Sequence, residues 1–228
     1  MKTLKKLCWA LLVFLALPLQ GCALSNSGAA IDGQVVGAET HQPLEGVNVV
    51  ADWEMHWHGF NGGDTVVKLL ETVTDKDGRY HLPAWGPEPI PSYVPWDASQ
   101  NPVYPRIVFF KSGYYTNEVS NDDLFRGGIP RAWTTKSQWN GKTIGLKKFK
   151  GSLKEYSSQV EFFLGLAGAD AQCVLKSQVP RAVAVGIKEG ERLTQLGIRN
   201  ALPRLRDIDE SGDPACEALK KSIREYLK

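Results

Sequence analysis

The sequence predicts a mainly β chain with added α-helices, in which an antiparallel β-sandwich precedes a small helical C-terminal subdomain. Two observations support this. Up to residue 149, short runs of β-branched and aromatic residues alternate with clusters of Gly, Pro, Asn and Asp. From about Gly151, apolar residues recur at helical spacing instead. The predicted domains are therefore 31–149, a β-sandwich, and 150–228, a helical subdomain.

The predicted strands are short and are separated by turn residues, as is typical of antiparallel sandwiches. They cover residues 31–36, 47–53, 66–73, 80–82, 106–110 and 143–146.

Three helices are expected after the strands. Ser152 and Glu155 form a capping-box pattern that begins the first helix. The second spans about 179–196. Asp213 is expected to cap the third, with Pro214 at its first position. The apolar faces predicted for the first and third helices comprise Leu153, Tyr156, Val160, Phe163, Leu164, Ala167, and then Cys216, Leu219, Ile223 and Leu227.

The N-terminal residues 1–21 have the features of an export signal. A lysine-rich start precedes an apolar run over 7–19, which is shorter than the ~20 residues of a spanning helix. Leu19-Gln20-Gly21-Cys22 resembles the bacterial lipobox, although Gln20 departs from the usual small residue. This resemblance implies cleavage before Cys22 and its lipidation, while an ordinary secretory signal is the alternative. Residues 22–30 would then form a lipidated, flexible tether.

Location and charge follow from the same segment. Ala23, rather than an aspartate, favours the outer membrane over the inner one, so the protein is expected to face the periplasm or the cell surface. Removing the signal also removes Lys2, Lys5 and Lys6, which leaves 24 of the 27 basic residues against 25 acidic ones. A nearly neutral chain has no basic surface for phosphates, so nucleic acid is not expected as a partner.

Two cysteines, Cys173 and Cys216, remain once Cys8 is cleaved off and Cys22 carries lipid. In an oxidising compartment they are expected to form a disulfide, which would stabilise the fold by ~4 kcal/mol. A metal pair or a catalytic thiol are the alternatives, and neither has a histidine nearby in the sequence.

Residues 31–149 resemble carboxypeptidase regulatory-like domains, which have an immunoglobulin- or transthyretin-like sandwich. The similarity lies in Ile-Asp-Gly-Gln-Val-Val from residue 31, Pro-Leu-Glu-Gly-Val-Asn-Val from residue 43, and Thr-Asp-Lys-Asp-Gly-Arg-Tyr from residue 74. A strand followed by Gly113-Tyr114 matches a later element. The resemblance implies an accessory or binding role, because a fold of this kind does not itself define an activity.

Intradiol dioxygenases share this fold and provide an enzymatic alternative. Their iron is held by two tyrosines and two histidines. Tyr93 and Tyr104 could represent the tyrosines, but the comparable strand, 104–110, contains no histidine. The tail typical of the related hydroxyisourate hydrolases is also absent, so no enzyme and no cofactor are expected.

A second alternative is a metal site at His56 and His58, which would lie on one face of a strand. Asp52, Glu54 or Asp64 could add a carboxylate. The competing interpretation is a pair of exposed histidines that lead into the glycine-rich turn.

Aromatic residues gather in the hairpin that follows Asp52 and in a proline-rich insertion over 83–105. They could line a groove for a sugar or an extended peptide, or they could pack the long loop instead. The residues considered are Trp53, Trp57, Phe60, Trp85, Tyr93, Trp96 and Tyr104.

Together these features predict a membrane-anchored envelope lipoprotein that acts as a non-catalytic binding or assembly module. Its expected partners are the membrane, through the N-terminal lipid, and an envelope protein or glycan. The alternative function is a carbohydrate- or metal-binding accessory to an envelope enzyme.

Overall fold

The computed structural model describes residues 25–57, 63–92, 94, 103–121, 136–166, 173–202, 204–208 and 214–228. Within its elements, the side chains of residues 56, 57, 63, 64, 103, 104, 206 and 207 are not described.

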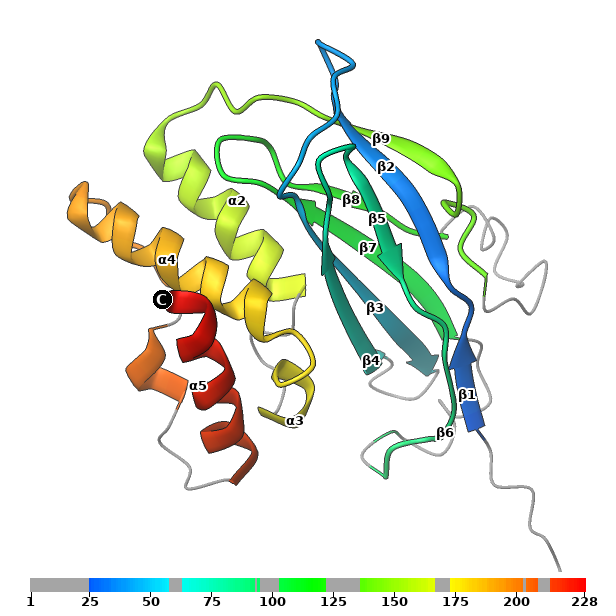
Figure 1. The fold of residues 1–228 in the computed structure, drawn as a ribbon. Coiled ribbons are helices and arrows are strands. Elements are labelled where there is room, and N and C mark those ends of the chain that lie inside the picture. The colour runs from blue at the N-terminus through cyan, green and yellow to red at the C-terminus, as the bar shows by residue number, and fades with distance from the viewer. Residues whose placement is uncertain are drawn as a thin grey trace, which may run out of the picture.

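Two sheets form the sandwich (Figure 1). The three-stranded sheet has the order β5-β2-β9, with β2 at Ile31–Gly37, β5 at Arg79–Leu82 and β9 at Lys142–Leu146. The four-stranded sheet has the order β4-β3-β7-β8, with bounds Asn48–Trp57 for β3, Gly63–Val73 for β4, Val103–Phe110 for β7 and Asn117–Val119 for β8. A separate two-stranded ribbon joins β1, Ser25–Gly28, to β6, Trp85–Pro89.

The predicted fold class is confirmed: antiparallel sheets are followed by C-terminal helices, and each predicted strand lies at the expected place in the chain. In one respect the pairing differs, because β2 and β9 run parallel, with Val35 opposite Ile144. More than 100 residues separate these two strands in the sequence, so no tight hairpin forces them to be antiparallel.

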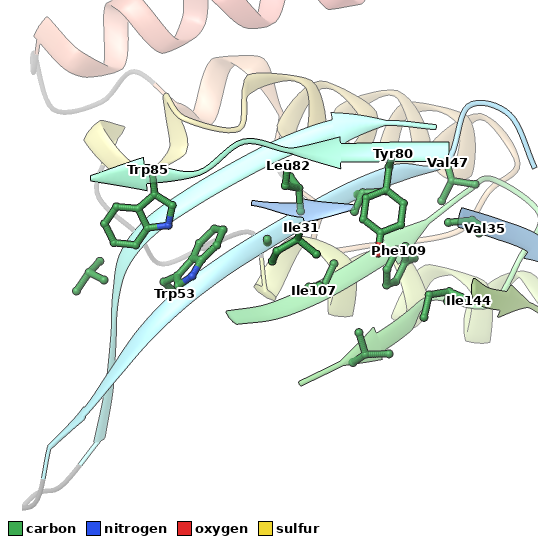
Figure 2. Close-up of a cluster of buried hydrophobic side chains, with 14 of the residues drawn as sticks. Ile31, Val35, Val47, Trp53, Tyr80, Leu82, Trp85, Ile107, Phe109 and Ile144 are labelled. Carbon is green, nitrogen blue, oxygen red and sulfur yellow. The ribbon is translucent and has the colours of Figure 1, made fainter. Parts of the chain in front are cut away.

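The core between the two sheets contains the inward side chains of both. Ile31, Tyr80, Leu82 and Phe109 lie in it, as Figure 2 shows. The strands alternate because successive residues point to opposite faces. Buried apolar area of this kind supplies most of the stabilisation of such a fold.

The β4–β5 turn has the geometry that its sequence predicts. The Asp75 carboxylate accepts hydrogen bonds from the backbone N–H of Asp77 at 2.9 Å and of Arg79 at 2.8 Å. Gly78 has φ +70°, a conformation that glycine adopts without a steric penalty. The turn therefore carries the chain from β4 of one sheet to β5 of the other.

The helices cover the other face of the four-stranded sheet (Figure 1). The elements are α2 at Leu153–Leu166, α3 at Cys173–Lys176, α4 at Pro180–Gln195, the 3₁₀ helix η3 at Leu205–Ile208 and α5 at Pro214–Leu227. Phe163 of α2 stacks on Phe110 of β7, with ring centroids 4.8 Å apart. Helix α5 packs on α4 through Leu219 and Ile223. The helical part therefore shares a core with the sandwich.

The helix ends agree with their predicted signals in most details. Ser152 and Glu155 form the capping box, since the Glu155 carboxylate accepts a hydrogen bond from the Ser152 N–H at 2.7 Å. On α2 the buried face is as expected except at Leu153, which is 42% exposed because it lies in the first turn, beyond the sheet. Ala167 and Asp213 lie outside the described residues.

Helix α4 begins without a side-chain cap of its own. Instead, the carboxylate of Glu71 on β4 accepts hydrogen bonds from the backbone N–H groups of Arg181 at 2.9 Å and Ala182 at 2.8 Å. A carboxylate at this position satisfies two free N–H groups and faces the positive end of the helix dipole. Glu71 thereby ties the helical part to the sheet.

A disulfide joins Cys173 on α3 to Cys216 on α5, with 4.9 Å between their Cα atoms. The two cysteines are 43 residues apart in the sequence. The two thiols are therefore engaged in a covalent link between helices.

Candidate functional site

Two of the predicted ligand-binding aromatics, Trp53 and Trp85, lie in the sandwich core. Trp53 is fully buried and Trp85 is 8% exposed. Their rings meet edge to face at 5.5 Å, and Figure 2 shows the indoles beside one another. Such packing suits the quadrupoles of aromatic rings. These two side chains fill the end of the core and do not line an open groove.

Gly28 of β1 lies directly against these indoles. A Cβ atom at this position would lie 2.8 Å from Nε1 of Trp53 and would overlap Nε1 of Trp85. Any larger residue would therefore have to displace a buried ring. Both indole N–H groups are buried, and neither has a hydrogen-bond partner among the described residues.

The other predicted binding residues cannot be placed as side chains. His56, Trp57 and Tyr104 lie on β3 and β7, and their side chains are not among those described. His58, Tyr93, Trp96 and Cys22 lie outside the described residues.

For the metal hypothesis, two findings bear on the described part of the chain. It contains no group of three or more His, Cys, Asp or Glu side chains that could hold a metal ion. The backbone of His56 lies opposite that of Asp64 across the β3–β4 pair. Asp52, which was a candidate carboxylate ligand, instead forms an ion pair with an arginine.

That arginine, Arg106 on β7, is the centre of a charged cluster. Its guanidinium binds both carboxylate oxygens of Asp52, at 2.5 Å from Nη2 and 3.2 Å from Nε. It also donates to Glu54 at 2.7 Å, and Glu118 lies 3.8 Å away. Three carboxylates on strands β3 and β8 thus surround one guanidinium on the helix-side face of the sheet.

Burial gives Asp52 an unusual titration. The side chain is 2% exposed, and this desolvation raises the pKa of Asp52 to about 7, although the hydrogen bonds and charge of Arg106 act in the opposite direction. A carboxyl group that titrates near neutrality can in principle transfer protons. Here both oxygens already accept hydrogen bonds from Arg106, so the group as folded joins two strands.

The sequence contains a signal for this cluster in the placement of charges beside apolar strand residues. Asp52 directly follows the apolar run 49–51 of β3, and Arg106 immediately precedes the apolar end of β7. Charged residues within buried strands are normally paired. A search for opposite charges in neighbouring apolar strands would therefore have found the pair.

Two hollows lie on the described surface. One of 490 Å³ separates β8 from β9 and is lined by residues 117–120, 138–139 and 143–145. The Trp139 indole N–H donates to the Ser120 carbonyl at 2.7 Å across the hollow's edge.

The other hollow, of 480 Å³, lies between α4 and η3. The polar side chains of Thr194 and Asn200 beside it donate to the Gly190 carbonyl at 2.8 and 3.2 Å. The Thr194 bond lies within α4, whereas the Asn200 bond holds the end of α4 to the chain that follows it.

Among the described residues, no helix is both long enough and apolar enough to cross a membrane.

No protein-family model matches this chain, and no curated protein matches it. The chain is similar to a solved 3-chlorocatechol 1,2-dioxygenase from Rhodococcus opacus 1CP, at 15% identity and a TM-score of 0.33, over 58% of this chain and 64% of that one. It is also similar to a streptococcal ancillary pilin, at 13% identity and a TM-score of 0.28, over 56% of this chain and 31% of that one.

A chlorocatechol 1,2-dioxygenase from Pseudomonas putida matches at 14% identity and a TM-score of 0.27, over 54% of this chain and 61% of that one. The chain spans less than two thirds of the length of each of these three structures. Similarity at this level assigns no activity to it.

Proposed function

We propose that this protein is an envelope lipoprotein, anchored through lipid on Cys22, whose sandwich serves as a non-catalytic binding or assembly module. The observation that carries the anchoring is the lipobox-like Leu19-Gln20-Gly21-Cys22 after the predicted export signal, and the folded domain begins close behind it. The first residue of β1, Ser25, follows Cys22 by only three positions, and β1 is already part of the folded domain. Several acyl chains at Cys22 would hold such a domain durably at a bilayer.

The non-catalytic role is supported by what the reactive groups of the described chain already do. Asp52 is bound by Arg106, Glu71 caps α4, and the Cys173 thiol is in a disulfide. Each group therefore has a structural partner that a reaction would have to displace.

A protein partner is favoured over a glycan on the same kind of evidence. Trp53 and Trp85, which a sugar site would need at the surface, are packed in the core. A sugar-binding or metal-binding accessory is the alternative. Its binding residues would lie outside the described part of the chain, as His58 and Trp96 do.

The anchoring is tested with Cys22→Ser in the native host. We expect the variant to move from the membrane fraction to the soluble envelope fraction, because the lipid supplies the attachment. Cys8→Ser is the matched control, since that cysteine is removed with the signal, and it should remain at the membrane. A Cys22→Ser protein that stayed in the membrane fraction would refute the lipoprotein proposal.

The binding role is tested on the wild-type lipoprotein from the same membranes. Crosslinking mass spectrometry should recover a reproducible protein partner, and elemental analysis should find no stoichiometric metal. A metal that is lost on His56→Ala would instead support the accessory alternative.

A further inference from the structure

We infer that the end of the sandwich formed by the β1–β6 ribbon rests against the lipid headgroups, so that the turns at the opposite end face away from the membrane. This inference depends on the proposed lipidation of Cys22. It adds an orientation and a membrane-facing surface to that proposal.

The tether between the lipidated residue and the folded domain is short. Only Ala23 and Leu24 separate Cys22 from Ser25, the first residue of β1. Because an extended chain spans at most about 3.6 Å per residue, the Cα atoms of Cys22 and Ser25 lie within about 11 Å of one another. The lipidated residue cannot be far from the ribbon.

The β1–β6 ribbon is part of the folded domain. β1 pairs with β6, with Ser25 opposite Pro89 and Gly28 opposite Trp85. The Asn26 side-chain amide lies 3.4 Å from the Met55 sulfur, which is fully buried in the core. The close fit of Gly28 to the two indoles adds to these contacts, so β1 is fixed to the domain and only Ala23 and Leu24 separate the domain from the lipidated residue.

The direction of the chain after β1 identifies the opposite end of the sandwich. From Ser25, β1 continues into β2 along the length of the sandwich (Figure 1). Gln34 on β2 lies opposite Arg79, beside the β4–β5 turn that contains Lys76. Residues 25–34 span at most about 30 Å, and they lead from the ribbon to the end of the sandwich at which Lys76 lies. Lys76 marks the membrane-distal end.

The chemistry of the ribbon suits a headgroup surface. Ser25, Pro87 and Pro89 are exposed, and the Lys68 ammonium is paired with the Glu88 carboxylate at 2.7 Å. This pair of opposite charges on the described ribbon is neutral overall, so it would be repelled by neither a zwitterionic nor an anionic membrane.

The test uses full-length lipoprotein in vesicles of phosphatidylethanolamine and phosphatidylglycerol. A photo-crosslinking phenylalanine analogue replaces Pro89 in one variant and Lys76 in another, since both positions are exposed. After illumination we expect several-fold more lipid adduct at position 89 than at position 76. A long Gly/Ser insertion between Leu24 and Ser25 should lower the signal at 89 to that at 76, because it frees the domain to move away.

Mass spectrometry of the N-terminal peptide separates the two levels of the argument. Equal lipid labelling at 89 and 76 in chains that carry lipid on Cys22 would overturn the orientation but leave the anchoring intact. A Cys22 without lipid would overturn the proposed function itself. If the Pro89 variant fails to fold, the same probe at Glu88, whose side chain is 47% exposed, gives the same comparison.

Discussion

The two faces of the four-stranded sheet differ in a way that explains the architecture. On the face toward β2, the side chains of β3 are apolar to the end of the described core, from Val49 through Trp53 to Met55. On the helix-side face, β3 has Asn48 and the buried Val50 and then changes to Asp52 and Glu54. One face is covered along its length, whereas the other is covered by helices only in part.

The order of apolar and polar residues in a strand therefore depends on what packs against each of its two faces. Where both faces are packed, a strand has consecutive apolar residues, as at 49–51 of β3. Where the helix-side face carries charged side chains instead, apolar and charged residues alternate, as they do from Asp52 to Met55, and Asp52 itself is buried and paired with Arg106. The change between Ala51 and Asp52 marks the start of the charged half of this face.

The apolar half of the helix-side face should give the largest effect. Phe163→Ala removes a fully buried ring that stacks on Phe110, and we expect it to destabilise the protein by about 4 kcal/mol, because a cavity remains where α2 meets β7. Equilibrium unfolding in urea measures the loss. Hydrogen exchange should accelerate in α2 and α4 before it does so in β2.

The neighbouring residue provides the control. Phe162 is 46% exposed on the same helix, so Phe162→Ala should change stability by no more than about 0.5 kcal/mol. Equal losses for the two variants would show that the helices do not share a core with the sheet.

The charged half of the same face should give the next largest effect. Arg106→Leu removes the guanidinium from between Asp52, Glu54 and Glu118, and we expect a loss of about 3 kcal/mol at pH 8, because a carboxylate buried without its partner is costly. Arg79→Leu, an identical change at an exposed position on β5, should have little effect.

The pH dependence of this loss has a definite sign. Burial raises the pKa of Asp52 from 3.8 to about 7, so between these values the folded state holds a proton that the unfolded state releases. This contribution to stability is present at low pH and declines as the pH rises through 7. The loss in Arg106→Leu should therefore be smaller at pH 5 than at pH 8, and a loss independent of pH would contradict the assignment of charges.

How far the sequence predicts this molecule depends on the range of the interactions. Turn and cap signals are local, so the Asp75–Gly78 turn and the Ser152 cap could be identified from neighbouring residues. The parallel pairing of β2 with β9 and the capping of α4 by Glu71 join distant segments, and no local pattern encodes them.

The ribbon and the aromatic residues show the same limit. Residues 25–28 have the small, polar composition of a tether, yet they form β1, because Gly28 fits against Trp85. Aromatic content alone could not separate Trp53 and Trp85 of the core from a binding surface. The partner strand decides which of these roles a residue has, and it lies far away in the sequence.

The smallest effect is expected at the attachment of α4, beside the boundary between the two halves. Glu71→Gln keeps the shape of the side chain but replaces one of the two acceptor oxygens that face the N–H groups of Arg181 and Ala182 with a donor. We expect a loss of about 1 kcal/mol, similar to that of a helix cap, because one N–H group loses its acceptor and the helix dipole loses a negative charge.

Hydrogen exchange at those two amides measures this directly, and Glu45→Gln, at an exposed loop position, is the control. Faster exchange at Arg181 and Ala182, with β3 unchanged, would show that Glu71 holds the helical cover to the sheet at one edge. Unchanged exchange there would mean that packing between Phe163 and Phe110 determines where the cover sits, independently of Glu71.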